Sequence, residues 1–227
     1  MTNKLKKRLI IAFKHNNISS IGIGGMIVFI AMVLVAGIAA STLIQTSSQL
    51  ESQAMITGRQ TKTEVSSDLD VLKVSGQYGT REISGTNYSR FHNMTILVTP
   101  RAASVINLDE VVVQISDGTN LVILSWNSKF SSSPSGSGVF STADVFDLNA
   151  SEFGIIVVED GDGSCTLGSP SINHGDKAII TVNLSACFSG LTPRTDINGL
   201  VLPEHGSPGI FLFRTPATTS KTVIRFL

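Results

Sequence analysis

The sequence predicts an α+β protein in which a long N-terminal hydrophobic α-helix is followed by an all-β antiparallel sandwich or barrel domain. Two observations predict this division. The stretch from Ser19 to Leu50 contains no charged residue and holds much of the apolar content of the 227-residue chain. From about Leu69 onward, short runs rich in valine, isoleucine and threonine alternate with turn residues, without helical segments between them.

Residues 1–19 form a basic leader, and no acidic residue occurs before Glu51. Its basic residues are Lys4, Lys6, Lys7, Arg8 and Lys14. A basic leader before an apolar segment is typical of signal peptides and of membrane anchors whose basic end stays in the cytoplasm. Removing these five charges from the 17 basic residues leaves 12 against 17 acidic ones, so the remaining chain is mildly acidic. This balance argues against a nucleic-acid partner.

Residues 20–66 are expected to form one continuous helix. Ile21 to Ile44 already provides enough apolar residues to cross a bilayer. Beyond Leu50, apolar or small residues recur every three or four positions with charges between them, and no proline occurs before Pro100. The helix is therefore too long for a single membrane crossing. Its small residues would let neighbouring helices approach closely, in particular Gly22, Gly24, Gly25, Ala36, Gly37 and Ala40.

Residues 67–227 are expected to form the β domain. The segment Ser116–Asn120 predicts a hairpin connection, and the Ser/Gly-rich segment Ser131–Ser141 predicts an exposed loop. The expected strands are Leu69–Val74, Asn93–Thr99, Glu110–Ile115, Leu121–Trp126, Phe153–Glu159, Ala178–Leu184, Gly209–Phe213 and Thr222–Phe226.

Two blocks near the ends of the chain resemble the archaeal flagellins, or archaellins, which are type IV pilin-like filament subunits. Gly22 to Ser47 reads GIGGMIVFIAMVLVAGIAASTLIQTS and is similar to the family's N-terminal segment. Gly175 to Pro216 is similar to its closing strands, with GLTPRT at Gly190 to Thr195 and PEHGSPG at Pro203 to Gly209. Because both blocks occur in the expected order, the chain is identified as resembling an archaellin.

The resemblance implies a structural subunit that polymerises through its N-terminal helix into the helical filament of the archaellum, which supports swimming. Copies of this chain, with or without paralogous archaellins, would form an extracellular filament whose core is made of packed helices. The precursor would reside in the cytoplasmic membrane, and a prepilin-peptidase-like enzyme would remove the leader between Ser19 and Ser20. The residues before this bond, Asn16 to Ser19, differ from the basic residues and glycine that the family usually has there.

Two other functions share some of these features. An archaeal type IV-like adhesion pilin would have the same leader and helix, although the C-terminal block favours the archaellin. A membrane-anchored surface-binding domain would keep its leader and stay monomeric. An enzyme is not expected, because the histidines are scattered and no catalytic or phosphate-binding motif is present. No cofactor and no nucleic-acid partner are expected.

The acidic segment Glu159 to Ser164 has two interpretations. Asp160 and Asp162 alternate with glycines and could supply oxygen ligands to Ca²⁺. The segment is too short for an EF-hand, and the same composition is typical of a tight turn, which we prefer. The resemblance keeps the weaker calcium interpretation open, since some archaellins carry a metal.

Modification sites are also predicted for an extracellular domain. Asn-x-Ser/Thr triplets occur at Asn87, Asn93, Asn149 and Asn183, and the resemblance makes N-glycosylation a reasonable expectation. Asn87 and Asn149 lie in expected loops and are the preferred candidates. Cys165 and Cys187 are candidates for a disulfide, because thiols outside the cell are not kept reduced.

Overall fold

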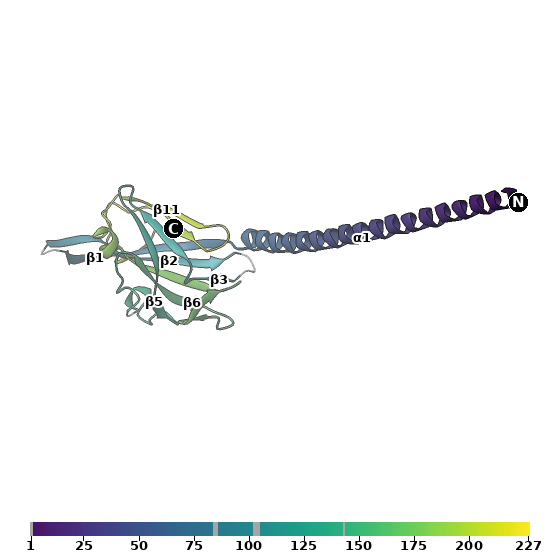
Figure 1. Ribbon diagram of the computed structural model, residues 1–227. Coiled ribbons are helices and arrows are strands. Elements are labelled where there is room, and N and C mark those ends of the chain that lie inside the picture. The colour runs from purple at the N-terminus through teal and green to yellow at the C-terminus, as the bar shows by residue number, and fades with distance from the viewer. Residues whose placement is uncertain (1, 84–85, 102–104, 143) are drawn as a thin grey trace. The chain divides into compact units, whose positions relative to one another are not determined.

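The computed structural model describes residues 2–83, 86–101, 105–142 and 144–227, with the backbone alone described for 2–21, 66, 81–83 and 86–88. The chain forms two compact units, residues 1–59 and 60–227. The helix α1, Thr2–Ser66, makes up the first unit and the start of the second (Figure 1). All the strands belong to the second, which we call the β unit.

The helix α1 confirms the expectation of a long apolar N-terminal helix. It contains no proline, and the leucine, alanine and methionine residues of its apolar part are good helix formers. The hydroxyls of Thr42 and Thr46 donate to the carbonyl oxygens of Ala39 and Leu43, at 2.9 and 3.0 Å. These polar groups are therefore satisfied within the helix itself.

The β unit is built on a nine-stranded sheet with the strand order β11-β10-β4-β5-β6-β9-β2-β1-β12, and on a small sheet with the order β3-β8-β7. A short helix α2, Leu184–Phe188, and a 3-10 turn, Val139–Ser141, lie in connections. The strands are β1 Leu69–Ile83, β2 Thr86–Pro100, β3 Ile106–Asn107, β4 Val112–Ser116, β5 Leu121–Ser131, β6 Glu152–Glu159, β7 Cys165–Thr166, β8 Ser169–Ile172, β9 Lys177–Asn183, β10 Asp196–Leu202, β11 Gly209–Arg214 and β12 Val223–Arg225.

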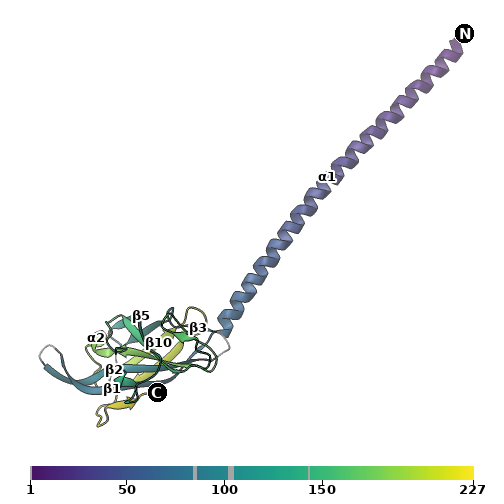
Figure 2. The same cartoon turned by 90° about the horizontal axis from the view of Figure 1, so that it is seen from below.

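The large sheet is strongly curled (Figures 1 and 2), and its inner face surrounds the main hydrophobic core. Inward-facing residues from its first strands, such as Ile115 and Phe211, belong to the same core as Val74 and Ile180 from its last strands. The two ends of the sheet also touch, because Asp68 and Ser207 form an isolated bridge beside β1 and β11. This barrel-like closure confirms the predicted β class.

Close packing at this closure requires glycine at position 206. Its φ is +95°, and a Cβ atom there would lie 1.6 Å from the carbonyl oxygen of Ser67. The backbone N–H of Ser207 donates to that same oxygen at 2.9 Å. No residue with a side chain fits this position without moving the start of β1.

Eight expected strands correspond to strands of the structure, and the Ser116–Asn120 segment forms the β4–β5 hairpin connection. The structure differs from the prediction at β10, at the short strands β3, β7 and β8 and at the short helix α2, which were not expected. It also differs at the pairing of β5 with β6, which is parallel. The connection from residue 132 to 151 carries the chain back along the sheet, so β6 enters in the same direction as β5. Among the described residues, the other pairings between named strands are antiparallel.

Candidate functional site

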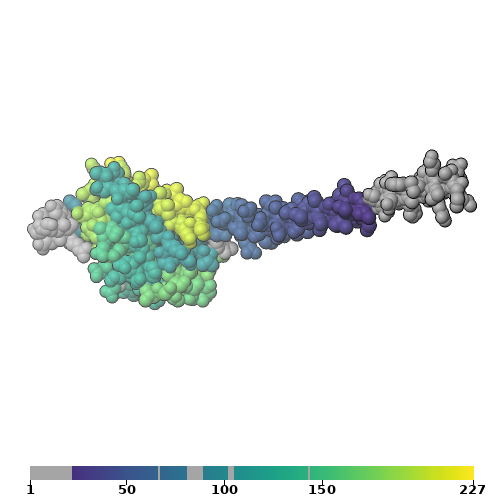
Figure 3. Space-filling view, viewed as in Figure 1, coloured from purple at the N-terminus to yellow at the C-terminus, as the bar shows by residue number. Residues whose placement is uncertain are grey.

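The apolar part of α1 is the most prominent candidate for a functional surface. The segment Gly22–Val65 is long and apolar enough to cross a membrane, with a mean hydropathy of 2.7 in its most apolar window. All of its residues are exposed in the single chain (Figure 3). Burying side chains of this size is strongly favourable in water, so the segment requires lipid or other protein around it.

The small residues of α1 open space along this surface. A Cβ atom added at Gly22, Gly24, Gly25 or Gly37 would meet nothing within 4 Å in the single chain. A shallow apolar groove of about 440 Å³ runs over Ala31, Ala36 and Ala39 between the larger side chains of Val28, Met32 and Val35. A neighbouring helix could bring its own side chains into this space.

The expected cleavage point, Ser19 and Ser20, lies within the backbone of α1, and the side chains there are outside the described part of the structure. Ala40 lies four residues after Ala36 and therefore on the same face of the helix. The assignment of these residues to filament packing stays a prediction.

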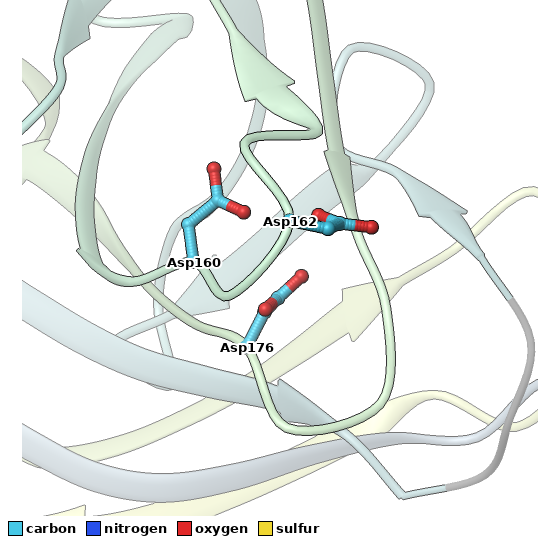
Figure 4. Close-up of side chains that lie close together, drawn as sticks. All are labelled: Asp160, Asp162 and Asp176. Carbon is cyan, nitrogen blue, oxygen red and sulfur yellow. The ribbon is translucent and has the colours of Figure 1, made fainter.

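In the β unit, three aspartates converge beside the start of β9 (Figure 4). Asp160 and Asp162 come from the loop after β6, and Asp176 precedes β9. They meet because Glu159 of β6 pairs with Lys177 of β9, which places the two strand ends side by side. One carboxylate oxygen from each aspartate lies within 4.8 Å of the others. Sequence reasoning missed Asp176, which is separated from Asp160 by a loop and two short strands.

Backbone N–H groups surround these carboxylates. Asp160 accepts hydrogen bonds from the backbone of Gly163 at 2.8 Å and of Cys165 at 3.1 Å. The buried Asp176 accepts from Gly161 at 3.1 Å and from Asn173 at 2.9 Å, so it joins the loop to the turn before β9. These hydrogen bonds stabilise the turn, so they explain the aspartates here without the need for a bound ion. Three carboxylates also form a donor set that suits a hard cation such as Ca²⁺.

Hydrogen bonds keep Asp162 ionised. The hydroxyl and backbone N–H of Ser164, followed by the side chain of Asn173, lower the pKa of this carboxyl group. The Asn173 amide donates to Asp162 Oδ2 at 2.6 Å. The loop therefore carries negative charge at neutral pH.

The four asparagine candidates occupy different surroundings. Asn149 is exposed, and its side-chain amide donates to Glu152 at 2.9 Å. Asn93 is half-buried and donates to Gln77 at 2.9 Å. Asn183 caps α2 through its Oδ1 and donates from Nδ2 to the carbonyl oxygen of Leu148 at 3.1 Å. Asn87 lies in β2 rather than in a loop, and its side chain is outside the described part.

The candidate disulfide between Cys165 and Cys187 is not formed in this structure, in which both cysteines are free. Cys165 lies in β7 near the start of β9, whereas Cys187 lies in α2 beyond the end of β9. The seven-residue strand between these places spans roughly 20 Å, too far for a disulfide. Burial raises the pKa of each thiol to about 11.

The buried histidine His92 connects neighbouring elements of the β unit. It is buried, with Nδ1 2.8 Å from the Ser185 hydroxyl and Nε2 2.9 Å from the carbonyl oxygen of Gly79. These contacts tie α2 to β1 and β2. His92 therefore has a structural role in the described structure.

Comparison with known proteins identifies relatives along nearly the whole chain. The family model of the archaeal-type flagellins matches residues 19–213. Flagellin B2 of Methanocaldococcus jannaschii is 41% identical over 206 residues, covering 89% of this chain and 91% of the relative. Flagellin B3 of Thermococcus kodakarensis is 35% identical, with 90% and 96% covered.

Two solved structures share the fold. The crystal structure of the archaeal flagellin FlaB1 from Methanocaldococcus jannaschii has a TM-score of 0.61 and 26% identity, covering 70% of this chain and 96% of that one. The archaeal flagellum of Methanospirillum hungatei strain JF1 has a TM-score of 0.60 at 14% identity, with 89% and 98% covered. The second likeness concerns the fold alone.

Proposed function

The chain belongs to the archaeal-type flagellin family, and we infer that it is a structural subunit of an extracellular archaellum filament. The exposed apolar segment Gly22–Val65 is the observation that carries this inference. A subunit needs such a surface because polymerisation buries it against other copies. The family is a structural one, so the chain is not an enzyme. The family match extends to residue 213 and includes much of the C-terminal block, which disfavours the adhesion-pilin alternative.

The two parts of the chain have different roles in this proposal. Residues 20–66 of several subunits pack together as the filament core, with Gly22, Gly24, Gly25, Ala36, Gly37 and Ala40 at the closest approaches. The β unit forms the outer layer. Copies of this chain polymerise alone or together with paralogous archaellins, and the filament supports swimming.

Before assembly, the apolar helix resides in the cytoplasmic membrane, with the basic leader on the cytoplasmic side. A prepilin-peptidase-like enzyme then cuts between Ser19 and Ser20. The start of the family match at residue 19 supports a boundary at this place. Cleavage removes the leader with its five basic residues. The helix can then leave the membrane and pack in the filament.

The test is N-terminal sequencing of filaments sheared from cells that express the chain. The expected result is a mature protein that begins at Ser20. Recovery of the full-length chain only in the membrane fraction, with no filaments, would overturn the proposal. If the chain began at Ser20 but was recovered only as a detergent-extracted monomer, leader cleavage would be supported and assembly into filaments would not.

A further inference from the structure

Four neighbouring strands, β11, β10, β4 and β5, carry an apolar surface on the face turned away from the core. Along β11, Phe211 and Phe213 are buried, whereas Ile210 and Leu212 are each 68% exposed. The register places Ile210 beside Leu200. We call this surface the outer patch, and its apolar members are Val112, Leu121, Ile123, Leu200, Leu202, Ile210 and Leu212.

A sheet face that meets only water usually carries polar residues in alternation with the buried ones. Single exposed apolar side chains are common, but five exposed and two half-buried ones on four adjacent strands indicate an interaction surface. The patch has an acidic end, because Glu110 precedes Val111 and Val112 in the chain, and Glu204 follows Leu202 and Pro203. Asp109 adds a third exposed carboxylate there.

The other strands of the sheet carry a groove on their outer face, with a volume of about 460 Å³. Ser75, Thr95 and Ile179 line it from β1, β2 and β9. Val139 and Phe140 line it from the connection between β5 and β6.

The groove carries the opposite charge to the acidic end of the outer patch. Lys73 lines the groove and is exposed. Lys221 and Arg225, also exposed, lie on either side of the lining residues Thr222 and Val223. Arg225 is beside the lining residue Ser75 in the β1–β12 pairing. We call Lys73, Lys221 and Arg225 the basic edge of the groove.

The outer patch and the groove lie on opposite walls of the curled sheet. The inward-facing residues of both walls share one core, represented by Ile115 on one side and Ile180 on the other. Their outer faces therefore point away from each other. A subunit with two different apolar surfaces on opposite sides can bind one neighbour through each of them.

We propose that the outer patch of one subunit docks in the groove of a second copy of this chain, and that this contact repeats along the filament. This inference rests on the proposed function, because a filament supplies the neighbouring copies. A contact between two different surfaces does not pair two subunits symmetrically, and where its rotation does not close a ring it extends with each added subunit into an open helix. The acidic end of the patch meets the basic edge of the groove, which orients the contact.

Photo-cross-linking in assembled filaments tests the contact. A benzophenone amino acid replaces Leu212 in the full chain, filaments are sheared and irradiated, and the covalent dimer is digested with trypsin. The expected product joins the patch to residues 74–81 or 222–225 of another subunit, two tryptic peptides that carry groove-lining residues. The same group at Val223 should cross-link to the peptide 195–214.

Leu167 provides the matched control, because it is apolar, 56% exposed and outside both surfaces. A benzophenone there should give no cross-link to peptide 74–81 or 222–225 of another subunit. Filaments that assemble normally but cross-link patch to patch, or give no dimer from Leu212 and Val223, would overturn the proposal alone. Absence of filaments from the unmodified chain would overturn the proposed function and this proposal with it.

Charge variants give a second readout if the bulky group prevents assembly. Leu212→Glu and Val223→Glu each place a charge on a surface that is exposed in the monomer, so the β unit should keep its circular dichroism spectrum. Both should lose filament yield relative to Leu167→Glu. Equal yields of all three variants would overturn the proposal.

Discussion

The rings of Phe213 and Phe226 stack almost in parallel, with centroids 4.3 Å apart and an angle of 5° between their planes. Phe213 belongs to β11, at one end of the nine-stranded sheet, and Phe226 directly follows β12, at the other end. The stack therefore joins the two edges of the curled sheet. Phe226 also meets Phe91 edge to face at 5.1 Å, so the C-terminal segment closes the core.

Removing the Phe226 ring should open this closure. We expect Phe226→Ala to lower the free energy of unfolding by about 2 kcal/mol, because the ring is half-buried and loses an aromatic stack. Chemical denaturation followed by tryptophan fluorescence measures the change. Leu227→Ala, at the more exposed next position, is the control. An equal and small effect of both variants would show that the stack does not hold the edges together.

The long helix and most strands could be predicted because their signals are local. In α1, composition and the absence of proline suffice. In β9 the β-branched run is continuous, and in β4 only Gln114 interrupts it. The strand β10 was missed because Asn198 and Gly199 interrupt its pattern. The structure explains this glycine, since a Cβ atom at position 199 would lie 2.1 Å from the Phe211 ring.

Other features depend on which strands become neighbours, and this is not a local property of the sequence. The third aspartate, Asp176, joins Asp160 only through the β6–β9 pairing. The same strand β9 separates the two cysteines that were expected to pair. The outer patch had a local signal that was overlooked, because IFLF in β11 is apolar on both faces where a half-exposed strand usually alternates.

Asp176 should stabilise the acidic loop as a hydrogen-bond acceptor. We expect Asp176→Ala to lower the free energy of unfolding by about 2 kcal/mol with calcium chelated, because the N–H groups of Gly161 and Asn173 lose their acceptor. Thermal unfolding measures the change, and Asp147→Ala is the control. An unchanged midpoint in chelator would contradict the turn interpretation. A calcium-dependent rise of the wild-type midpoint that Asp162→Asn removes would show cation binding in addition.

Glycosylation should occur at Asn149 and not at Asn183. The Asn149 side chain is exposed and donates to Glu152 at the start of β6, whereas the Asn183 amide is engaged with Leu148 and caps α2. Mass spectrometry of peptides from native filaments measures occupancy at each site. Ser151→Ala removes the Asn149 triplet and serves as the control. A glycan on Asn183 in folded protein would contradict the described geometry.

The carboxylates Glu110 and Glu204 should make stability depend on pH. A side-chain hydrogen bond with Glu204, and then its charge, raise the pKa of Glu110. A raised pKa means that the folded state holds the proton more tightly, so this contribution is complete at low pH. It is lost as the pH rises through the raised pKa.

Glu204→Gln should therefore flatten the decline of the unfolding midpoint as the pH rises from the ordinary pKa of a glutamate through the raised pKa of Glu110. It should also move the NMR titration of the Glu110 carboxyl back toward its ordinary range. Glu51→Gln removes the same charge from α1 and should leave the slope unchanged. A Glu110 titration that does not respond to Glu204→Gln would contradict the coupling.

Close approach between helices should make Gly37 sensitive to substitution in the filament but not in the folded β unit. A Cβ atom at Gly37 meets nothing within 4 Å in the single chain, so a larger residue costs little before assembly beyond its helix preference. In a packed core, Gly37→Leu holds neighbouring helices apart, and Ala36→Asp buries a charge. We expect both variants to reach the membrane with a folded β unit and to yield no sheared filaments. Thr61→Leu, later in the same helix, is the control for added bulk. Normal filaments from Ala36→Asp would show that this face of α1 is not in the filament core.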